Sequence, residues 1–112
     1  MDTKWIKQAV AEYAPMVAKR QAAFFHLSDG RTLCIIRTAS GCRWGMCRLH
    51  HRDMHHKQLG NSLAYLRAKF GRGGGATIHE LGDILLHLPS DELDRVDAVI
   101  ARMHSEEFVH EC

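Results

Sequence analysis

Residues 25–47, FHLSDGRTLCIIRTASGCRWGMC, carry the strongest fold signals in this chain. Within them, Asp29-Gly30 separates a short apolar run at 25–27 from a longer strand-like run at 32–38. A two-residue type I′ turn needs positive φ at both central positions, and Asp-Gly is among the dipeptides that adopt it most readily. We therefore expect a tight β-hairpin at this point.

The two strands after this turn differ in their patterns. Residues 33–36 (Leu-Cys-Ile-Ile) are apolar without alternation, which is typical of a central strand covered on both faces. After a second turn, residues 42–49 alternate, so that Cys42, Trp44 and Met46 share one face of a strand. The chain therefore predicts a three-stranded antiparallel meander.

A helical pattern precedes the predicted sheet. Apolar residues recur at helical spacing over about residues 3–23, namely Ile6, Val10, Tyr13 and Val17. Pro15 removes one backbone hydrogen bond from this helix. We expect either a kink there or a second helix that has Pro15 in its first turn.

Three helices are expected after the sheet. The first has a stripe of bulky apolar residues between a cap at Asp53 and a stop at Gly71, namely Leu59, Leu63, Leu66 and Phe70. A Gly-rich connector at 71–76 leads to a short helix at 77–88, which a capping box opens. Ser90 caps the last helix, whose apolar face is Leu93, Val96, Val99, Ile100 and Met103.

These elements predict one α+β domain spanning residues 1–112. A helix-sheet-helix core would occupy 1–70, the Gly-rich connector 71–76, and acidic C-terminal helices 77–112. A hydrophobic content of 46% is ordinary for a globular protein, and no apolar run approaches the roughly 20 residues of a membrane span. Because no basic-then-apolar leader opens the chain, we expect a cytoplasmic protein with reduced cysteines and no membrane partner.

Charge is segregated along the chain. Residues 37–72 have a net charge of +7 and residues 80–112 a net charge of −7, although the whole chain has only +2. Such a dipolar distribution bears on partners more than on fold. We expect the basic segment to bind nucleic acid or a nucleoprotein complex, and the opposite charges to permit a homodimer.

The basic segment converges on the start of the helix predicted after the sheet. Cations there oppose the partial positive charge of a helix N-terminus, so a bound anion such as a phosphate would explain them. The candidate nucleic-acid or partner-binding residues are Arg43, Arg48, Arg52, His55, His56, Lys57 and Arg67. The alternative is a solvated basic face, partly paired with the acidic C-terminal helices.

The same region permits a zinc site as an alternative. Cys42, Cys47, His51 and His55 are residue types that zinc prefers, and a site there would make the chain a zinc-stabilised protein–protein interaction module. On an unbroken strand the two cysteines would face opposite ways, so the site needs a bulge at Gly45. We expect no metal or other cofactor. No set of residues satisfies the nucleophile, base and oxyanion roles by spacing, so we expect no enzyme activity.

Two features of the chain resemble known families. The order helix, three-stranded meander, helix is similar to double-stranded RNA-binding domains, and residues 56–58 (His-Lys-Gln) resemble their basic cluster, although the tight turn at 29–30 lacks the loop of that family. Residues 51–60 (HRDMHHKQLG), continuing to Ala64 and 67–68, resemble small uncharacterised proteins of phages and mobile elements. The second resemblance implies a non-enzymatic, host-directed regulator or inhibitor of the anti-defence type, some of which block nucleoprotein defence complexes.

Overall fold

The computed structural model describes residues 4–38, 41–48, 57–71, 85 and 88–110, with side chains as far as residue 103. The element order is α1 (Lys4–Ala18), β1 (Ala22–His26), β2 (Arg31–Thr38), β3 (Gly41–Arg48), α2 (Lys57–Phe70) and α4 (Ser90–His110). The strands form one antiparallel sheet in the order β1-β2-β3. The predicted α+β class and the three-stranded meander are therefore confirmed.

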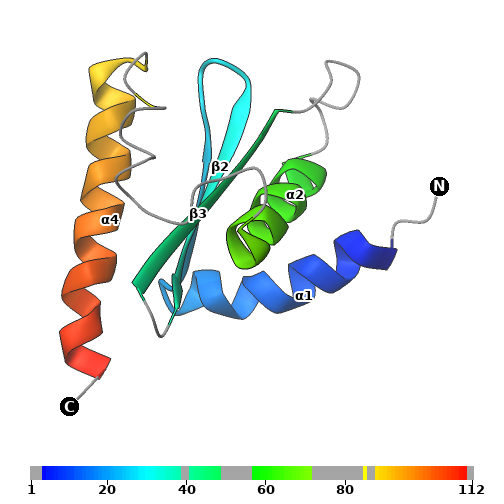
Figure 1. The fold of residues 1–112 in the computed structure, drawn as a ribbon, viewed down its shortest axis with the longest axis horizontal. Helices are drawn as coiled ribbons and strands as arrows, with labels where there is room; N and C mark the ends of the chain where they lie inside the picture. Colours follow the sequence, from blue (N-terminus) through cyan, green and yellow to red (C-terminus); the bar gives the residue numbers. More distant parts are fainter. Residues whose placement is uncertain (1–3, 39–40, 49–56, 72–84, 86–87, 111–112) are drawn as a thin grey trace.

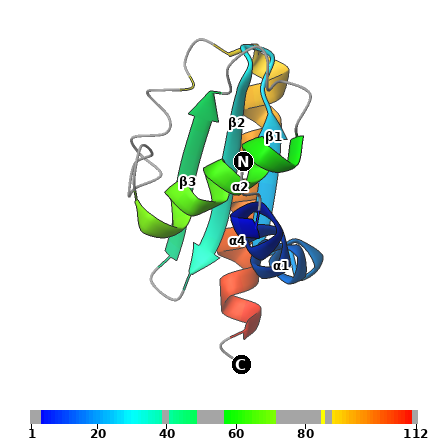
Figure 2. The same cartoon turned by 90° about the vertical axis from the view of Figure 1, so that its right-hand side faces the viewer.

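The elements form three layers. Helix α4 covers one face of the sheet, and α1 and α2 cover the other (Figures 1 and 2). Leu33 and Ile35 of β2 belong to the core beneath α4, whereas Cys34 and Ile36 belong to the core beneath α1 and α2. Because β2 is central and buried on both faces, its apolar residues do not alternate with polar ones.

The connection between β1 and β2 is not the predicted type I′ turn. The Leu27 N–H donates to the Arg31 carbonyl (2.8 Å) and the Gly30 N–H donates to the Leu27 carbonyl (3.0 Å), so the loop has three residues, 28–30. Of these, only Gly30 has positive φ (90°). This is a type I turn followed by glycine, and Asp29 stabilises it by accepting hydrogen bonds from the Arg31 backbone N–H (3.1 Å) and Nε (2.6 Å).

Helix α1 passes through Pro15 as one element and ends at Ala18, so the predicted extension to residue 23 is wrong. Two backbone hydrogen bonds form a Schellman motif after it. The Arg20 N–H donates to the Val17 carbonyl (3.0 Å), and the Gln21 N–H donates to the Met16 carbonyl (2.7 Å). Arg20 has a φ of 60°, in the left-handed position that glycine usually fills. Because the chain turns here, the two alanines that follow begin β1.

Helix α2 packs on the sheet through small residues and not through the predicted bulky stripe. Its buried positions are the small residues Gly60, Ser62, Ala64 and Ala68, together with Tyr65, whose ring packs against Tyr13 of α1. The three leucines of the predicted stripe are only partly buried, and Phe70 is 63% exposed. The cause lies in β3, because a Cβ at Gly45 would stand 2.2 Å from the Ala68 nitrogen and 2.3 Å from the Ala64 carbonyl oxygen. The helix backbone rests on the strand, and only small side chains fit a contact so close.

In the described residues two helices, α2 and α4, follow the sheet where three were predicted. The predicted cap at Asp53 and nearly all of the predicted helix at 77–88 lie outside the described residues. At the expected end of that helix, the Leu88 N–H donates to the Leu85 carbonyl (3.0 Å) in a turn. The Pro89 carbonyl accepts the first bonds of α4, so the helix cap lies one residue before the predicted Ser90.

Helix α4 contributes its predicted apolar face to the core. Val96 and Met103 are buried against the sheet, and the other three residues of that face pack around them. Glu92, in the first turn of α4, is also buried and accepts hydrogen bonds from the Ser28 N–H (2.9 Å) and Oγ (3.0 Å). These bonds attach α4 to the β1–β2 loop. No helix in the described ranges is long and apolar enough to cross a membrane.

Candidate nucleic-acid interface

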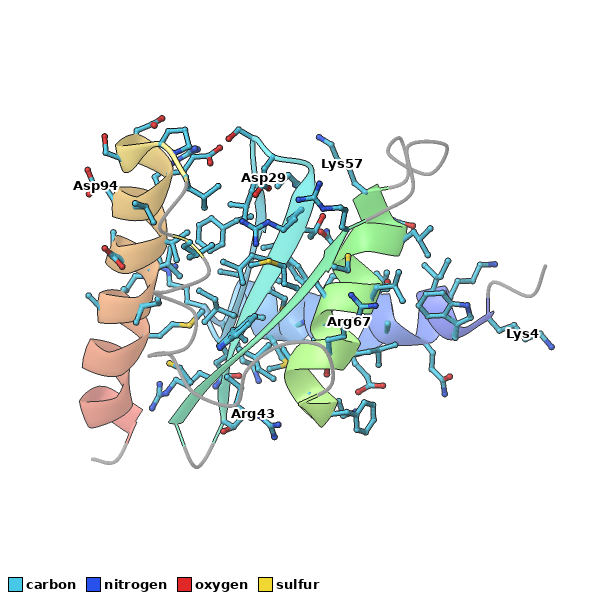
Figure 3. The ribbon with its side chains drawn as sticks, turned by 45° about the horizontal axis from the view of Figure 1, so that its top comes forward. Lys4, Asp29, Arg43, Lys57, Arg67 and Asp94 are labelled. Atoms are coloured by element: carbon cyan, nitrogen blue, oxygen red, sulfur yellow. The ribbon has the colours of Figure 1, made fainter. Side chains whose placement is uncertain are left out.

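The predicted basic residues that the structure describes lie along β3 and α2. Lys57 is the first residue of α2, Arg43 lies at the opposite end of that helix, and Arg67 lies between them (Figure 3). Arg48 is the exposed last residue of β3. We call Arg43, Lys57 and Arg67 the β3–α2 basic surface. Arg48 lies further along β3, and because side chains alternate along a strand, it belongs to the opposite face, which α4 covers. The other three candidates, Arg52, His55 and His56, lie outside the described residues.

Arg67 joins α2 to the edge of the sheet. Its Nη1 donates a hydrogen bond of 2.8 Å to the Met46 carbonyl of β3. Because β3 is an edge strand, its outward carbonyls lack partners in the sheet, and this guanidinium supplies one. A guanidinium has five N–H donors, so the bond to Met46 leaves donors for an anion.

Arg43 lies against the C-terminal end of α2. A Cβ at Gly71 would stand 2.6 Å from the Arg43 Nη2, so the guanidinium occupies the space that a larger residue would need. A helix C-terminus carries a partial negative charge, which favours a cation there. Gly71 has a φ of 70°, which agrees with its predicted place directly after the helix.

The charge of the β3–α2 basic surface is not neutralised by the rest of the described structure. Arg43, Arg48 and Lys57 form no ion pair with any residue that the structure describes. The acidic helix α4 lies on the opposite face of the sheet from α2 (Figure 1). The β3–α2 basic surface is therefore separated in space from α4, and among the described residues Arg43, Arg48 and Lys57 show no internal pairing with acidic residues.

Asp29 moderates the positive charge at the end of β3 where Arg48 lies. Burial alone would raise the pKa of the Asp29 carboxyl, but hydrogen bonds from Arg31 and the charges of Arg31 and Arg48 hold it below its usual range. Asp29 already forms an ion pair with Arg31 at 2.6 Å. Arg48 interacts electrostatically with this carboxylate but forms no ion pair with it.

The structure does not bring the alternative zinc ligands together. Strand β3 pairs with β2 in unbroken register, so Gly45 forms no bulge. As a result, Cys42 packs against the core beneath α4, and Cys47 lies in the core beneath α1 and α2. These two cysteines face opposite sides of the sheet and cannot bind one zinc ion. His51 and His55 lie outside the described residues.

Two of the cysteines are packing residues. Burial raises the pKa of the Cys34 thiol, and burial also raises the pKa of Cys47 although the charge of Arg67 opposes that shift. The Cys47 Sγ donates a hydrogen bond to the Gly60 carbonyl (3.3 Å). Because the thiolate is the nucleophilic form, neither thiol is prepared for covalent catalysis.

The structure adds Phe70, which sequence reasoning placed in the core. It is the last residue of α2 and 63% exposed, and the Lys69 Nζ lies 5.5 Å from its ring centroid. Helical periodicity could not reveal that Phe70 is exposed. The close contact at Gly45 turns the small-residue face of α2, and not its bulky stripe, toward the sheet.

Comparison with known proteins adds no family to this description. A scan against protein-family models, a search of curated proteins and a search of solved structures each found no match. The resemblances to double-stranded RNA-binding domains and to small phage proteins therefore rest on the chain itself.

Proposed function

We propose that this protein is a non-enzymatic nucleic-acid-binding protein that contacts phosphates through the β3–α2 basic surface. The observation that carries the proposal is that Arg43 and Lys57 have no ion-pair partner among the described residues. Lys57 also stands in a first helical turn that contains no acidic residue. Cations in these positions are stabilised by a bound anion, and the phosphates of a nucleic acid supply several at once.

The dimensions of the surface suit a polymer of phosphates. Lys57 and Arg43 lie at opposite ends of α2, and the 14 residues of this helix, at about 1.5 Å per residue, are about 21 Å long. Successive phosphates along one strand of duplex DNA advance about 3.4 Å along the axis, so this length spans about six of them. Arg67, between the two ends, offers further donors. Contacts of this kind make affinity strongly dependent on salt.

The biological role that we propose is that of a small cytoplasmic regulator or inhibitor of phage origin, directed at a nucleoprotein complex of the host. The resemblance of residues 51–60 to small phage and mobile-element proteins supports this role. Arg52, His55 and His56 belong to the segment that connects Arg48 to Lys57, so the proposed contact includes them. The buried thiols of Cys34 and Cys47 disfavour one kind of catalysis only, that by a cysteine nucleophile at these two positions.

Fluorescence anisotropy with a labelled oligonucleotide, at about 50 to 200 mM salt, tests this function. Arg43→Ala and Lys57→Ala should each weaken binding to all sequences and flatten the slope of log affinity against log salt by about 0.7 to 0.9. Arg95→Ala is the matched control, because it removes an exposed cation from α4. A variant that carries both substitutions and binds as tightly as the wild type would reject the proposal. An equal loss of affinity in Arg95→Ala would also reject it.

A further inference from the structure

We infer that Phe70 is a platform on which a base of single-stranded nucleic acid stacks, an inference that rests on the proposed function. Phe70 is 63% exposed, and the other exposed large apolar residue among those described, Val17, is 44% exposed. An aromatic ring contributes a large apolar area when it is covered, so a ring left open at the surface is available to a ligand. What has to be settled is the chemistry of that ligand.

Phe70 lies beside the β3–α2 basic surface, at its Arg43 end. Arg67 is three residues earlier in α2, and residues at this spacing are neighbours on the surface of a helix. The Arg43 guanidinium lies against Gly71, the residue that follows Phe70. Two cations that belong to different elements therefore flank the ring, and both lie where we expect phosphates. A ligand at Phe70 is thus negatively charged and carries a flat apolar group.

Lys69 has another role beside this ring. Its Nζ lies 5.5 Å from the ring centroid of Phe70 and also forms an ion pair of 2.5 Å with Glu12 of α1. Glu12 offsets the charge of Lys69, so the positive charge available to a ligand comes from the two arginines. Lys69 contacts the Phe70 ring, but most of the Phe70 side chain stays exposed.

These observations favour a single strand over a duplex. In a duplex each base is stacked between its neighbours, so a protein ring reaches a base face only after the stack has been opened. A single strand presents free base faces together with the same phosphates. Aromatic side chains beside a positively charged groove are the usual combination in proteins that bind single strands without sequence preference.

The inference is tested by measuring the affinity of the protein for a labelled oligothymidine and for a duplex of equal length. Phe70→Ala should weaken binding to the single strand about fivefold or more, while the salt slope stays unchanged because no charge is removed. Phe70→Trp should retain the affinity, because it keeps a ring that can stack. Val17→Ala, the matched control, removes an exposed apolar side chain from α1 and should bind like the wild type.

The alternative outcomes are distinguishable. If Phe70→Ala and the wild type bind the single strand equally, the stacking role is wrong and the proposed function stands. If the wild type binds neither oligonucleotide in a salt-dependent manner, both fail. If light scattering shows that Phe70→Ala converts a dimer to a monomer, Phe70 belongs to a contact between two chains and the inference is overturned.

Discussion

Replacing Gly45 by alanine perturbs the contact that positions α2, and with it the β3–α2 basic surface. The added Cβ would stand 2.2 Å from the Ala68 nitrogen and 2.3 Å from the Ala64 carbonyl oxygen, whereas ordinary van der Waals contact begins at 3.4 Å. Both atoms belong to the helix backbone and cannot rotate aside. Helix α2 would therefore have to move away from β3 by the difference, about 1.2 Å.

The cost of that movement follows from the packing that it disrupts. A gap of about 0.5 to 1 Å forfeits a quarter to a half of the dispersion energy between facing atoms, and overpacking a core costs about 1 to 3 kcal/mol. Because the helix backbone is blocked at two atoms, we expect the upper end, a loss of about 3 kcal/mol in the free energy of unfolding. For a domain of this size the melting temperature should fall by about 10 °C.

Urea denaturation followed by tryptophan fluorescence measures this loss, because Trp44 is 1% exposed in the folded protein, and a Trp5→Phe background removes the signal of the second tryptophan. Gly41→Ala is the control: it adds the same methyl group to β3, where no atom lies within 4 Å of the new Cβ. Its cost should be the backbone strain of a φ of 120° alone, about 1 to 3 kcal/mol, with no displacement of α2. If Gly45→Ala proved as stable as the wild type, α2 would not rest on the strand and the reasoning would be refuted.

Three further predictions concern stability. The Ser62 Oγ is buried and has no hydrogen-bond partner among the described residues, so Ser62→Ala should raise the free energy of unfolding by about 1 kcal/mol in urea denaturation; a loss would show that the hydroxyl is bonded. Arg20→Gly should raise the free energy of unfolding by about 1 kcal/mol because it relieves the positive φ of 60°, whereas Lys19→Gly should lower it. A higher melting temperature for Lys19→Gly than for Arg20→Gly would contradict the Schellman motif at the end of α1. Burial, with the charge and hydrogen bond of Glu12, raises the pKa of Tyr65 from 10.0 to about 12. Because the folded pKa is the higher one, its stabilising effect is complete below pH 10 and is lost between about pH 10 and 12. Tyr65→Phe should therefore show a smaller fall in melting temperature over that interval, and an identical fall would exclude Tyr65 as its source.

The sheet could be predicted from the sequence because its signals are local. The uninterrupted apolar run at 33–36 is a direct consequence of burial on both faces. Asp29-Gly30 correctly located the first hairpin. The predicted type of turn was wrong, because the observed turn is stabilised by hydrogen bonds from Arg31 to Asp29, which the dipeptide alone does not reveal.

The orientation of α2 could not be predicted, because it depends on a contact between distant parts of the chain. Helical spacing selected Leu59, Leu63, Leu66 and Phe70, but the flat site at Gly45 accepts the small residues on another side of the helix. The segregation of charge was visible in composition. Its consequence, a basic surface remote from the acidic helix, required α4 to pack on the opposite face of the sheet.

The central claim is that nucleic acid binds along β3 and α2, and amide chemical shifts locate that contact directly. During titration of the labelled protein with an oligonucleotide at low salt, we expect salt-reversible shift changes in β3 (Gly41–Arg48) and α2 (Lys57–Phe70). The amides of α4 (Ser90–His110) should keep their positions, because its acidic residues repel phosphate. Shift changes confined to α4 or α1, or none at any oligonucleotide concentration, would contradict the account.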